Sequence, residues 1–273
     1  MRRLLVAVLL LGTSACTVET ERGEVGVYDL PTAVGDGGAP NELGPYPASY
    51  FLTMYLRDFK RYDANDPTTN PGFDNLNSEK SVVSATLGEG RKPVYRAPLN
   101  ALPTFGQKYF DQWYRDVPLT NYTVVYPLPV ALGPDGLYQY DSQTSGKPDT
   151  YQGVARRVFF PLDDGDPYAT PFGNQGQTHN TAFTGELHAT FVAGADNVLH
   201  VRADDDLYVF VNNQLAIDLG GTHVASTADL ALSSLGLSVG ETYALDIFYA
   251  ERLGATGALT LQTDLLLVPV LNP

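Results

Sequence analysis

The chain has 273 residues, of which 44% are hydrophobic and 18% are charged, and its formal charge at pH 7 is −14. A chain of this length and composition can bury a substantial core, as one large β domain or as two smaller ones. The acidic balance argues against nucleic acid as a partner, because binding to phosphates depends on clustered Lys and Arg. An acidic surface favours solubility and cation binding, but by itself it indicates no function.

The N-terminal residues 1–15 have the layout of an export signal, with two arginines ahead of an apolar run from Leu4 to Leu11. This run is too short to span a bilayer, which takes about 20 apolar residues. Small residues then lead to Cys16, the only cysteine of the chain. The pattern resembles a bacterial lipobox and predicts lipidation at Cys16, since a lone thiol would be an odd leftover in an exported chain. The alternative is an ordinary cleaved signal with an incidental cysteine.

Residues 16–47 are poor in aliphatic residues and rich in Gly, Pro, Glu and Asp, which predicts a flexible acidic tether. From Tyr50 onward, short β-branched and aromatic runs alternate with turn residues, so residues 48–270 are expected to form one all-β domain with many short strands and long loops. The best helical candidate is Thr104–Arg115. The clearest strands are expected at 121–126, 187–192, 198–203, 207–211, 215–219, 242–250 and 258–267.

Three adjacent carboxylates, Asp204, Asp205 and Asp206, precede the strand expected at 207–211. Adjacent like charges disfavour one another's ionisation unless a cation or donor lies among them. In a regular strand the three side chains would alternate between faces and could not meet one ion. An irregular backbone, of which a cis peptide bond between two aspartates is one form, would let them converge. Calcium suits such a site because it accepts about 6–8 oxygens at flexible angles.

The segments DDDLYVFVNNQLAIDLGGTH and LGLSVGETYALDIFYAER resemble the fibro-slime domain family, whose members are similar to the PA14 β-sandwich. The resemblance covers roughly Ser49 to Asp264, with Tyr208 standing where tryptophan is usual. It implies an extracellular antiparallel β-sandwich without enzymatic activity, with long loops and at most one or two short helices, as used in adhesion and matrix proteins. Further segments that match in the same order are YLRDF, TLGEGRKPVY, FDQWYRDVP, YQYDS, FFPLD and HNTAFTGELHATF.

The resemblance also implies a calcium site. Yeast flocculins, in the wider superfamily, bind sugars through calcium held by two consecutive aspartates joined by a cis bond. Asp204 and Asp205 are the matching positions, and Asp206 is a substitute ligand. The sugar-binding loops of flocculins have no counterpart that aligns here. Further candidates for contact with the ligand or with the metal-binding residues are Asn212, Asp218, His223 and Glu251; His223 fits a metal ligand and a turn cap equally well.

Other polar and aromatic groups have structural interpretations. Glu186 and His188 are expected to pair on the surface. Trp113 and its aromatic neighbours are expected to pack in the core, with a sugar-stacking platform as the alternative. The acidic loop Asp163–Asp166 lacks EF-hand spacing and is expected to be a solvated turn or a second source of metal ligands.

No nucleophile elbow, Walker loop or His-Glu-x-x-His motif occurs in the sequence. We therefore expect a non-enzymatic, calcium-dependent adhesion module that binds a glycan or matrix polymer. It would be exported as an outer-membrane lipoprotein at the cell surface, in contact with the membrane only through its lipid anchor. The alternatives are a structural matrix protein in which calcium only stabilises the fold, and a glycoside hydrolase whose carboxylates, such as Asp204 and Glu251, stand about 5–9.5 Å apart.

Overall fold

The computed structural model describes residues 16–19, 25–28, 47–74, 80–96 and 104–271, and the chain divides into two compact units, residues 1–46 and 47–273. In the first unit, strands β1 (Cys16–Glu19) and β2 (Val25–Tyr28) pair antiparallel, within the segment that the sequence assigns to a tether. The export signal expected at residues 1–15 lies outside the described residues.

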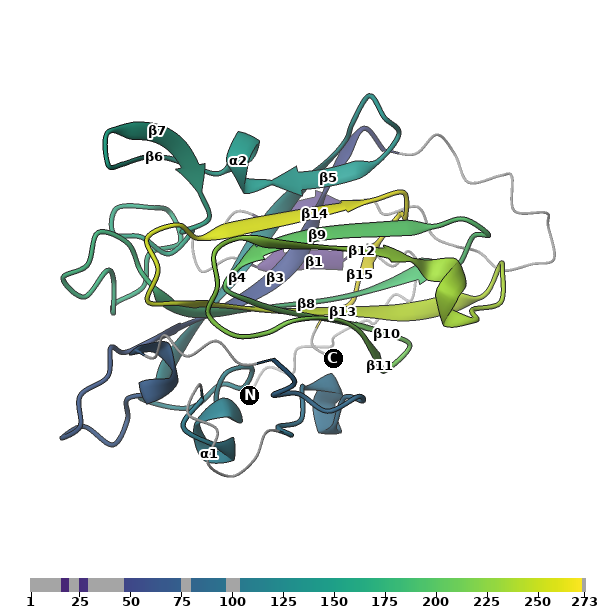
Figure 1. Cartoon of the computed structure of the whole chain (residues 1–273). Helices are drawn as coiled ribbons and strands as arrows, with labels where there is room; N and C mark the ends of the chain where they lie inside the picture. Colours follow the sequence, from purple (N-terminus) through teal and green to yellow (C-terminus); the bar gives the residue numbers. More distant parts are fainter. Residues whose placement is uncertain (1–15, 20–24, 29–46, 75–79, 97–103, 272–273) are drawn as a thin grey trace, which may run out of the picture. The chain divides into compact units, whose positions relative to one another are not determined.

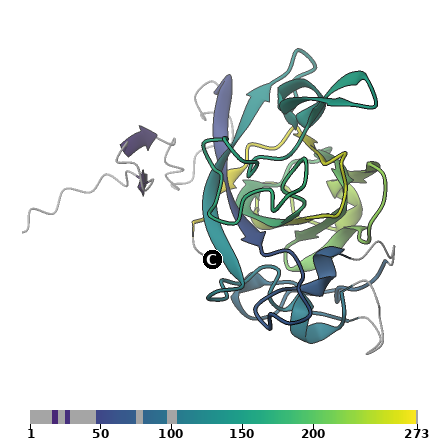
Figure 2. The same cartoon turned by 90° about the vertical axis from the view of Figure 1, so that its left-hand side faces the viewer.

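The second unit is built on one 11-stranded antiparallel sheet that curls around a common interior (Figures 1 and 2). The strand order is β11-β10-β13-β8-β3-β4-β5-β14-β9-β12, with β15 added beside β8. This architecture confirms the all-β antiparallel prediction. The bounds are β3 (Ser49–Phe59), β4 (Asn121–Leu132), β5 (Tyr138–Asp141), β8 (Ala182–Val192), β9 (Val198–Asp204), β10 (Asp206–Val211), β11 (Gln214–Leu219), β12 (Ser226–Ala231), β13 (Thr242–Arg252), β14 (Ala258–Thr263) and β15 (Val268–Pro269).

A separate two-stranded hairpin, β6 (Lys147–Tyr151) and β7 (Val154–Val158), stands out beside the main sheet (Figure 1). The helices are single turns: α1 (Gln107–Phe110), α2 (Ser142–Ser145), η1 (Pro71–Asp74), η2 (Glu89–Arg91) and η3 (Leu232–Leu235). In the part of the chain that the structure describes, no helix is both long and apolar enough to cross a membrane.

The helix expected over Thr104–Arg115 is wrong in extent, because only α1 is α-helical there. Phe105 and Gly106 have φ angles of 54° and 94°, which are not helical, and the residues after α1 continue as turns. The aromatic spacing that suggests a helix instead serves to insert Phe110, Trp113 and Tyr114 one by one against the outside of the sheet.

Two apolar clusters explain this burial. The larger cluster fills the interior of the curled sheet, and the second joins the outer faces of β10 and β13 to the segments between β3 and β4. Tyr208, Phe210 and Phe248 meet Phe59, Phe73, Phe110, Trp113 and Tyr114 in the second cluster. Strand β10 is therefore covered on both faces, as its unbroken apolar sequence predicts. Trp113 is 0% exposed, which confirms its role in packing.

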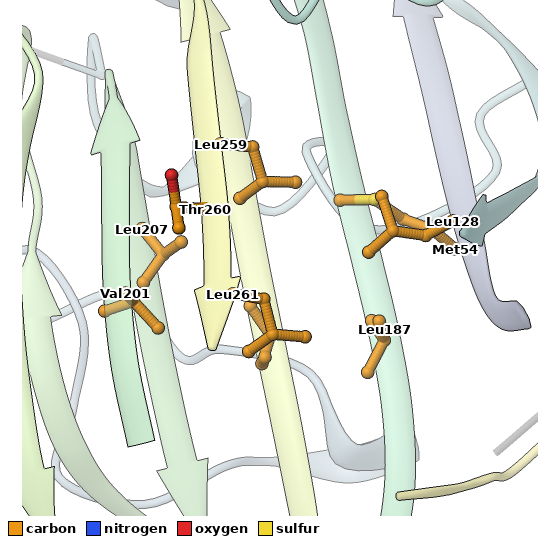
Figure 3. A pocket seen from close by; sticks show the side chains of 9 residues that line it. Met54, Leu128, Leu187, Val201, Leu207, Leu259, Thr260 and Leu261 are labelled. Carbon is orange, nitrogen blue, oxygen red and sulfur yellow. The ribbon is translucent and has the colours of Figure 1, made fainter. Parts of the chain in front are cut away.

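The interior also contains a small pocket, shown in Figure 3, in which Thr260 supplies the one side-chain oxygen. An apolar lining of this kind offers a polar ligand almost no hydrogen bonds, so the pocket belongs to the packing of the core. The other lining residues are Met54, Leu128, Leu187, Val201, Leu207, Ile247, Leu259 and Leu261.

Candidate functional site

The acidic triplet lies where β9 passes into β10. Strand β9 ends at Asp204, β10 begins at Asp206, and the peptide bond between Asp204 and Asp205 is cis, as the family resemblance implies. The three side chains are only 1–3% exposed. The chain thus buries three consecutive carboxylates at the junction of two strands.

Two loops flank this junction, because Asp204 pairs with Ala258 at the start of β14, and Ala203 pairs with Ser226 at the start of β12. The loop before β12 covers residues 220–225, and the loop before β14 covers residues 253–257. Both loops donate hydrogen bonds to the triplet, so their positions and the orientation of its carboxylates depend on each other.

Asp206 is held by protein donors on both carboxylate oxygens. Its Oδ2 accepts from Arg252 Nε at 2.7 Å, and its Oδ1 accepts from the Tyr208 hydroxyl at 2.9 Å and from the Gly221 amide at 2.6 Å. The Arg252 guanidinium lies 5.3 Å from the centre of the Trp113 ring. These contacts favour a structural role for Asp206 over the metal-binding role expected from the sequence.

Asp205 accepts two main-chain hydrogen bonds, from His223 N to Oδ1 at 2.9 Å and from Arg252 N to Oδ2 at 3.0 Å. Burial, followed by the charge of Asp206, nevertheless raises the pKa of Asp205 to about 8. Asp204 accepts from Thr256 Oγ1 to Oδ2 at 2.7 Å, and a carboxylate has lone pairs for further partners. The pair therefore retains capacity to bind a cation.

Glu251 lies beside this pair and is 0% exposed. Its Oε2 accepts from the Tyr249 hydroxyl at 2.8 Å, whereas its Oε1 is buried with no hydrogen-bond partner in the described part of the chain. Burial, followed by the charges of Asp205 and Asp204, raises the pKa of Glu251 well above its ordinary value. A buried carboxylate oxygen without a donor costs free energy unless a proton or a cation meets it.

We call Asp204, Asp205, Asp206, Glu251 and Arg252 the acidic cluster. Its four carboxylates are buried, and within the described residues its ion pairs include one cation, Arg252. No group of three or more His, Cys, Asp or Glu side chains in those residues has an arrangement ready to hold a metal ion. A calcium ion here would depend on the carboxylates of Asp204 and Asp205, with Glu251 Oε1 or main-chain carbonyls completing the oxygens it prefers.

Two other candidate residues, His223 and Asp218, have structural contacts in the turn that follows β11. His223 is half-buried and its ring nitrogens contact the main-chain oxygens of Leu219 and Val224, so the structure favours the turn-capping interpretation. Asp218 accepts from the amides of Gly220 and Ser81 and thereby fixes the same turn.

Asn212, the fourth candidate for contact with the ligand or the metal-binding residues, lies apart from the acidic cluster. It lies in the β10–β11 turn, with φ 48°, at the opposite end of β10 from Asp206. The turn needs a left-handed backbone at this position, a conformation that asparagine tolerates.

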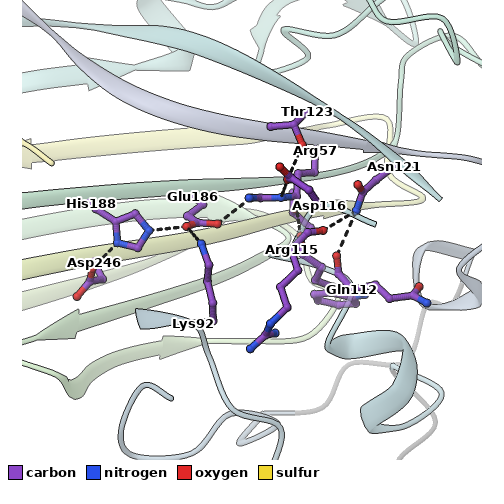
Figure 4. A network of polar contacts seen from close by, with 12 residues as sticks. Arg57, Lys92, Gln112, Arg115, Asp116, Asn121, Thr123, Glu186, His188 and Asp246 are labelled. Atoms are coloured by element: carbon purple, nitrogen blue, oxygen red, sulfur yellow. Dashed lines mark hydrogen bonds and ion pairs between the residues drawn. The ribbon is translucent and has the colours of Figure 1, made fainter. Parts of the chain in front are cut away.

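A second group of buried charges, which the sequence does not reveal, lies on the outer face of β8 and β13 (Figure 4). The Glu186 carboxylate contacts Arg57 Nη1 at 2.7 Å, Lys92 Nζ, and His188 Nε2 at 2.5 Å. On the other side, Asp246 Oδ1 contacts His188 Nδ1 at 2.5 Å and Arg91 Nη2 at 2.6 Å. We call these six residues the balanced cluster.

The pairing expected for Glu186 and His188 is confirmed, but its expected location on the surface is wrong, because both residues are at most 1% exposed. Burial raises the pKa of Glu186, but the hydrogen bond from His188 and the charges of Arg57 and Lys92 outweigh burial and together lower this pKa to about 2. The segment that contains Lys92 lies over the sheet here and excludes water.

The acidic loop Asp163–Asp166 is also not a simple solvated turn. Asp163 is 2% exposed and accepts from Lys147 Nζ at 2.9 Å and from the Asn180 amide at 2.7 Å, and His179 Nδ1 lies 2.7 Å from it. These contacts assign its carboxylate to holding the loop in place.

The comparisons with known proteins agree with this architecture. A family model described as the PA14 domain matches residues 169–267, which include β8 to β14 and the whole acidic cluster. Among curated proteins, psiR of Dictyostelium discoideum is 32% identical over 210 residues, covering 75% of this chain and 20% of that protein. The protein psiC of the same organism is 30% identical over 219 residues, covering 75% and 40%. The chain thus spans between a fifth and two fifths of the length of these relatives.

Solved structures with local likeness include the PA14 domain of the MpAFP antifreeze protein, with a TM-score of 0.30 and 9% identity, covering 84% of this chain and 86% of that one. A PA14 sugar-binding domain from an RTX adhesin has a TM-score of 0.24 and 21% identity, covering 33% and 48%. The PA14 family model thus matches about a third of this chain, in a unit whose sheet is antiparallel throughout.

Proposed function

We propose that residues 47–273 form a non-enzymatic, calcium-dependent module that binds carbohydrate, or a carbohydrate-rich matrix polymer, at the cell surface. The observation that carries the proposal is the charge excess of the acidic cluster. Asp204, Asp205 and Glu251 are buried together, and the guanidinium of Arg252 is already paired with Asp206. Buried carboxylates are normally paired or coordinate metals, so this arrangement favours a bound cation.

Calcium is the cation that the chemistry favours. The side-chain atoms that the site offers are oxygens, including Glu251 Oε1 and the carboxylates of Asp204 and Asp205, and calcium takes carboxylate and carbonyl oxygens at variable angles. Zinc is disfavoured, since the nearby His223 uses both ring nitrogens on main-chain oxygens and the chain's single cysteine is Cys16.

Carbohydrate is the ligand class that suits such an ion, because sugar hydroxyls are neutral oxygen ligands that can complete its coordination. The RTX adhesin domain described above is a sugar-binding domain, and we extend that ligand class to this chain on the chemistry of the site alone. In the alternative, a structural matrix protein, calcium would stabilise the same loops without a sugar.

The finer assignments follow the sequence motifs. We propose a fibro-slime type of domain, on the segments DDDLYVFVNN and LDIFYAER, exported as an outer-membrane lipoprotein with its acyl chains on Cys16. Changing Cys16 to Ser should then release the protein from membranes, because the acyl chains supply the apolar burial that anchors it. Unchanged membrane fractionation of this variant would contradict the anchor.

A glycan array probed with and without chelator tests the main proposal. The parent protein should bind a subset of glycans in calcium and none in chelator, and Asp204→Asn/Asp205→Asn should bind none in either condition. Asp229→Asn is the matched control, since its side chain is 78% exposed and contacts His200 away from the cluster. Chelator-resistant binding would contradict the proposal, and calcium binding without any glycan binding would favour the structural alternative.

A further inference from the structure

The β6–β7 hairpin lies outside the ladder of the main sheet, yet it contacts the loop before β14, which flanks the acidic cluster. At its base, Lys147 Nζ lies 2.9 Å from Asp163 Oδ2. On β7, Arg156 donates from Nη2 to the main-chain oxygen of Ala255, in the loop before β14. The hairpin is thus attached at two points.

Arg156 also fixes an aromatic ring. Its Nε donates to Asp149 Oδ2 at 2.7 Å, and its guanidinium carbon lies 4.4 Å from the centre of the Tyr151 ring. Tyr151 is 42% exposed, and its cross-strand partner Val154 is 66% exposed. A cation over one face of an aromatic ring orients the ring and leaves the other face available.

The same loop connects this ring to the proposed calcium site. Ala255 accepts the Arg156 hydrogen bond, and its neighbour Thr256 donates to Asp204 Oδ2 at 2.7 Å. Tyr151 is therefore linked to Asp204 by a chain of contacts through Arg156, Ala255 and Thr256. An exposed, oriented ring next to a cation site has the features of a sugar-binding subsite, where an apolar ring face packs against an aromatic side chain.

We infer that Tyr151, oriented by Arg156, forms a second subsite that packs against a sugar ring of a neutral oligosaccharide whose neighbouring residue contacts the calcium. This inference rests on the proposed function. The ligand is longer than a monosaccharide, because Arg156, Ala255 and Thr256 all lie between Tyr151 and Asp204. It is neutral, because the chain has a formal charge of −14 and Asp149 already pairs with Arg156.

The test uses the full-length protein and a printed array of neutral glucose, mannose, galactose and N-acetylglucosamine mono- and oligosaccharides, with sialylated glycans included. Tyr151→Ala should bind oligosaccharides at least about fivefold more weakly than the parent, since the aromatic contact is lost. Tyr151→Phe should bind like the parent, because the ring remains. Calcium affinity, measured by calorimetry, should be the same in all three proteins, because Tyr151 contacts none of the carboxylates of the acidic cluster.

Tyr62→Ala is the matched control, since Tyr62 is 45% exposed in a loop that contacts Asp74. Equal oligosaccharide binding by the parent and Tyr151→Ala would overturn the inference while leaving the proposed function intact. An equal loss in Tyr62→Ala, or a preference for sialylated glycans or for monosaccharides, would also overturn it. A parent protein that binds calcium but no glycan would overturn both the inference and the proposed function.

Discussion

The balanced cluster and the acidic cluster are both buried and both include residues of β13, but they differ in charge. In the balanced cluster, Arg57, Arg91 and Lys92 surround two buried carboxylates that His188 bridges. In the acidic cluster, four carboxylates are buried and the guanidinium of Arg252 pairs with one of them, Asp206. The pKa shifts follow this difference, since the pKa of Glu186 falls to about 2 while that of Asp205 rises to about 8.

The difference teaches that burial alone does not determine what a carboxylate does. Burial raises the pKa of each carboxyl group, and neighbouring cations reverse that effect at Glu186 but not at Asp205. The balanced cluster pairs both of its carboxylates with cations of the protein, although Asp246 Oδ2 has no hydrogen-bond partner among the described residues, and it holds the segment containing Lys92 onto the sheet. The acidic cluster needs protons or a metal ion, so it is the one suited to respond to its surroundings.

The largest expected effect comes from breaking the balanced cluster. Glu186→Ala leaves Arg57 and His188 without their shared carboxylate, and removal of one partner from a buried ion pair costs about 3–5 kcal/mol. Urea unfolding should show this loss equally in calcium and in chelator. A loss below about 1 kcal/mol, or one that depends on calcium, would contradict the assignment of this cluster to structure.

The acidic cluster should respond in a different way. An ion that binds only the folded state at a hundredfold excess over its Kd adds about 2.7 kcal/mol, so calcium should raise the Tm of the parent by about 5–10 °C. Asp204→Asn/Asp205→Asn should lose this response. In chelator, however, the double variant should be at least as stable as the parent, because repulsion among buried carboxylates is reduced. If the double variant were equally destabilised in calcium and in chelator, these aspartates would stabilise the fold and would not bind a cation.

The pH dependence in chelator should also differ between the clusters. The pKa of Asp205 is raised in the folded state, so the folded protein holds a proton that the unfolded chain releases. Its contribution to stability is complete below about pH 4 and is lost as the pH rises toward about 8. Glu186 has the opposite sign, because its contribution is present above its unfolded pKa near 4.5 and is lost as the pH falls toward about 2.

Thermal unfolding between pH 5 and pH 9 can separate the contribution of Asp205 from that of Glu186, since Glu186 is ionised throughout that range. The parent in chelator should lose stability over this range, and Asp205→Asn should show a flatter profile. A parent profile identical to that of Asp205→Asn would show that Asp205 does not titrate as described.

A smaller effect is expected at His223. The His223 ring contacts the main-chain oxygens of Leu219 and Val224. Asp205, by contrast, accepts a hydrogen bond from the His223 main-chain amide, which a substitution retains. His223→Ala should therefore cost about 0.5–1.5 kcal/mol for the lost hydrogen bonds and leave calcium affinity unchanged. A large fall in calcium affinity would restore the metal-ligand interpretation of this histidine.

Much of the fold could be predicted from the sequence, because alternation and turn residues are local signals. The β10–β11 hairpin follows from the apolar run Leu207–Val211 and the Asn212–Asn213 pair, whose φ angles are 48° and 67°. The helix over Thr104–Arg115 could not be judged correctly, because its aromatic spacing fits an amphipathic helix and also a set of turns lying on an aromatic surface.

The candidate site was predictable only in part. The adjacent carboxylates of the triplet are visible in the sequence, and Glu251 is among the expected contacts. Its place near the triplet, however, depends on β13 lying beside β10, which pairs Asp206 with Ala250. The balanced cluster could not be found from pattern, because Glu186 and His188 alternate as on an exposed strand face. Only the long-range contacts of Arg57, Arg91 and Lys92 show that this face is covered.

Calorimetric titration of the purified protein with calcium tests the central claim most directly. The account predicts saturable binding of calcium by the parent, retention of that binding in Asp229→Asn, and its loss in Asp204→Asn/Asp205→Asn. No binding by a correctly folded parent, or unchanged affinity in the double variant, would contradict the claim that the acidic cluster is a cation site.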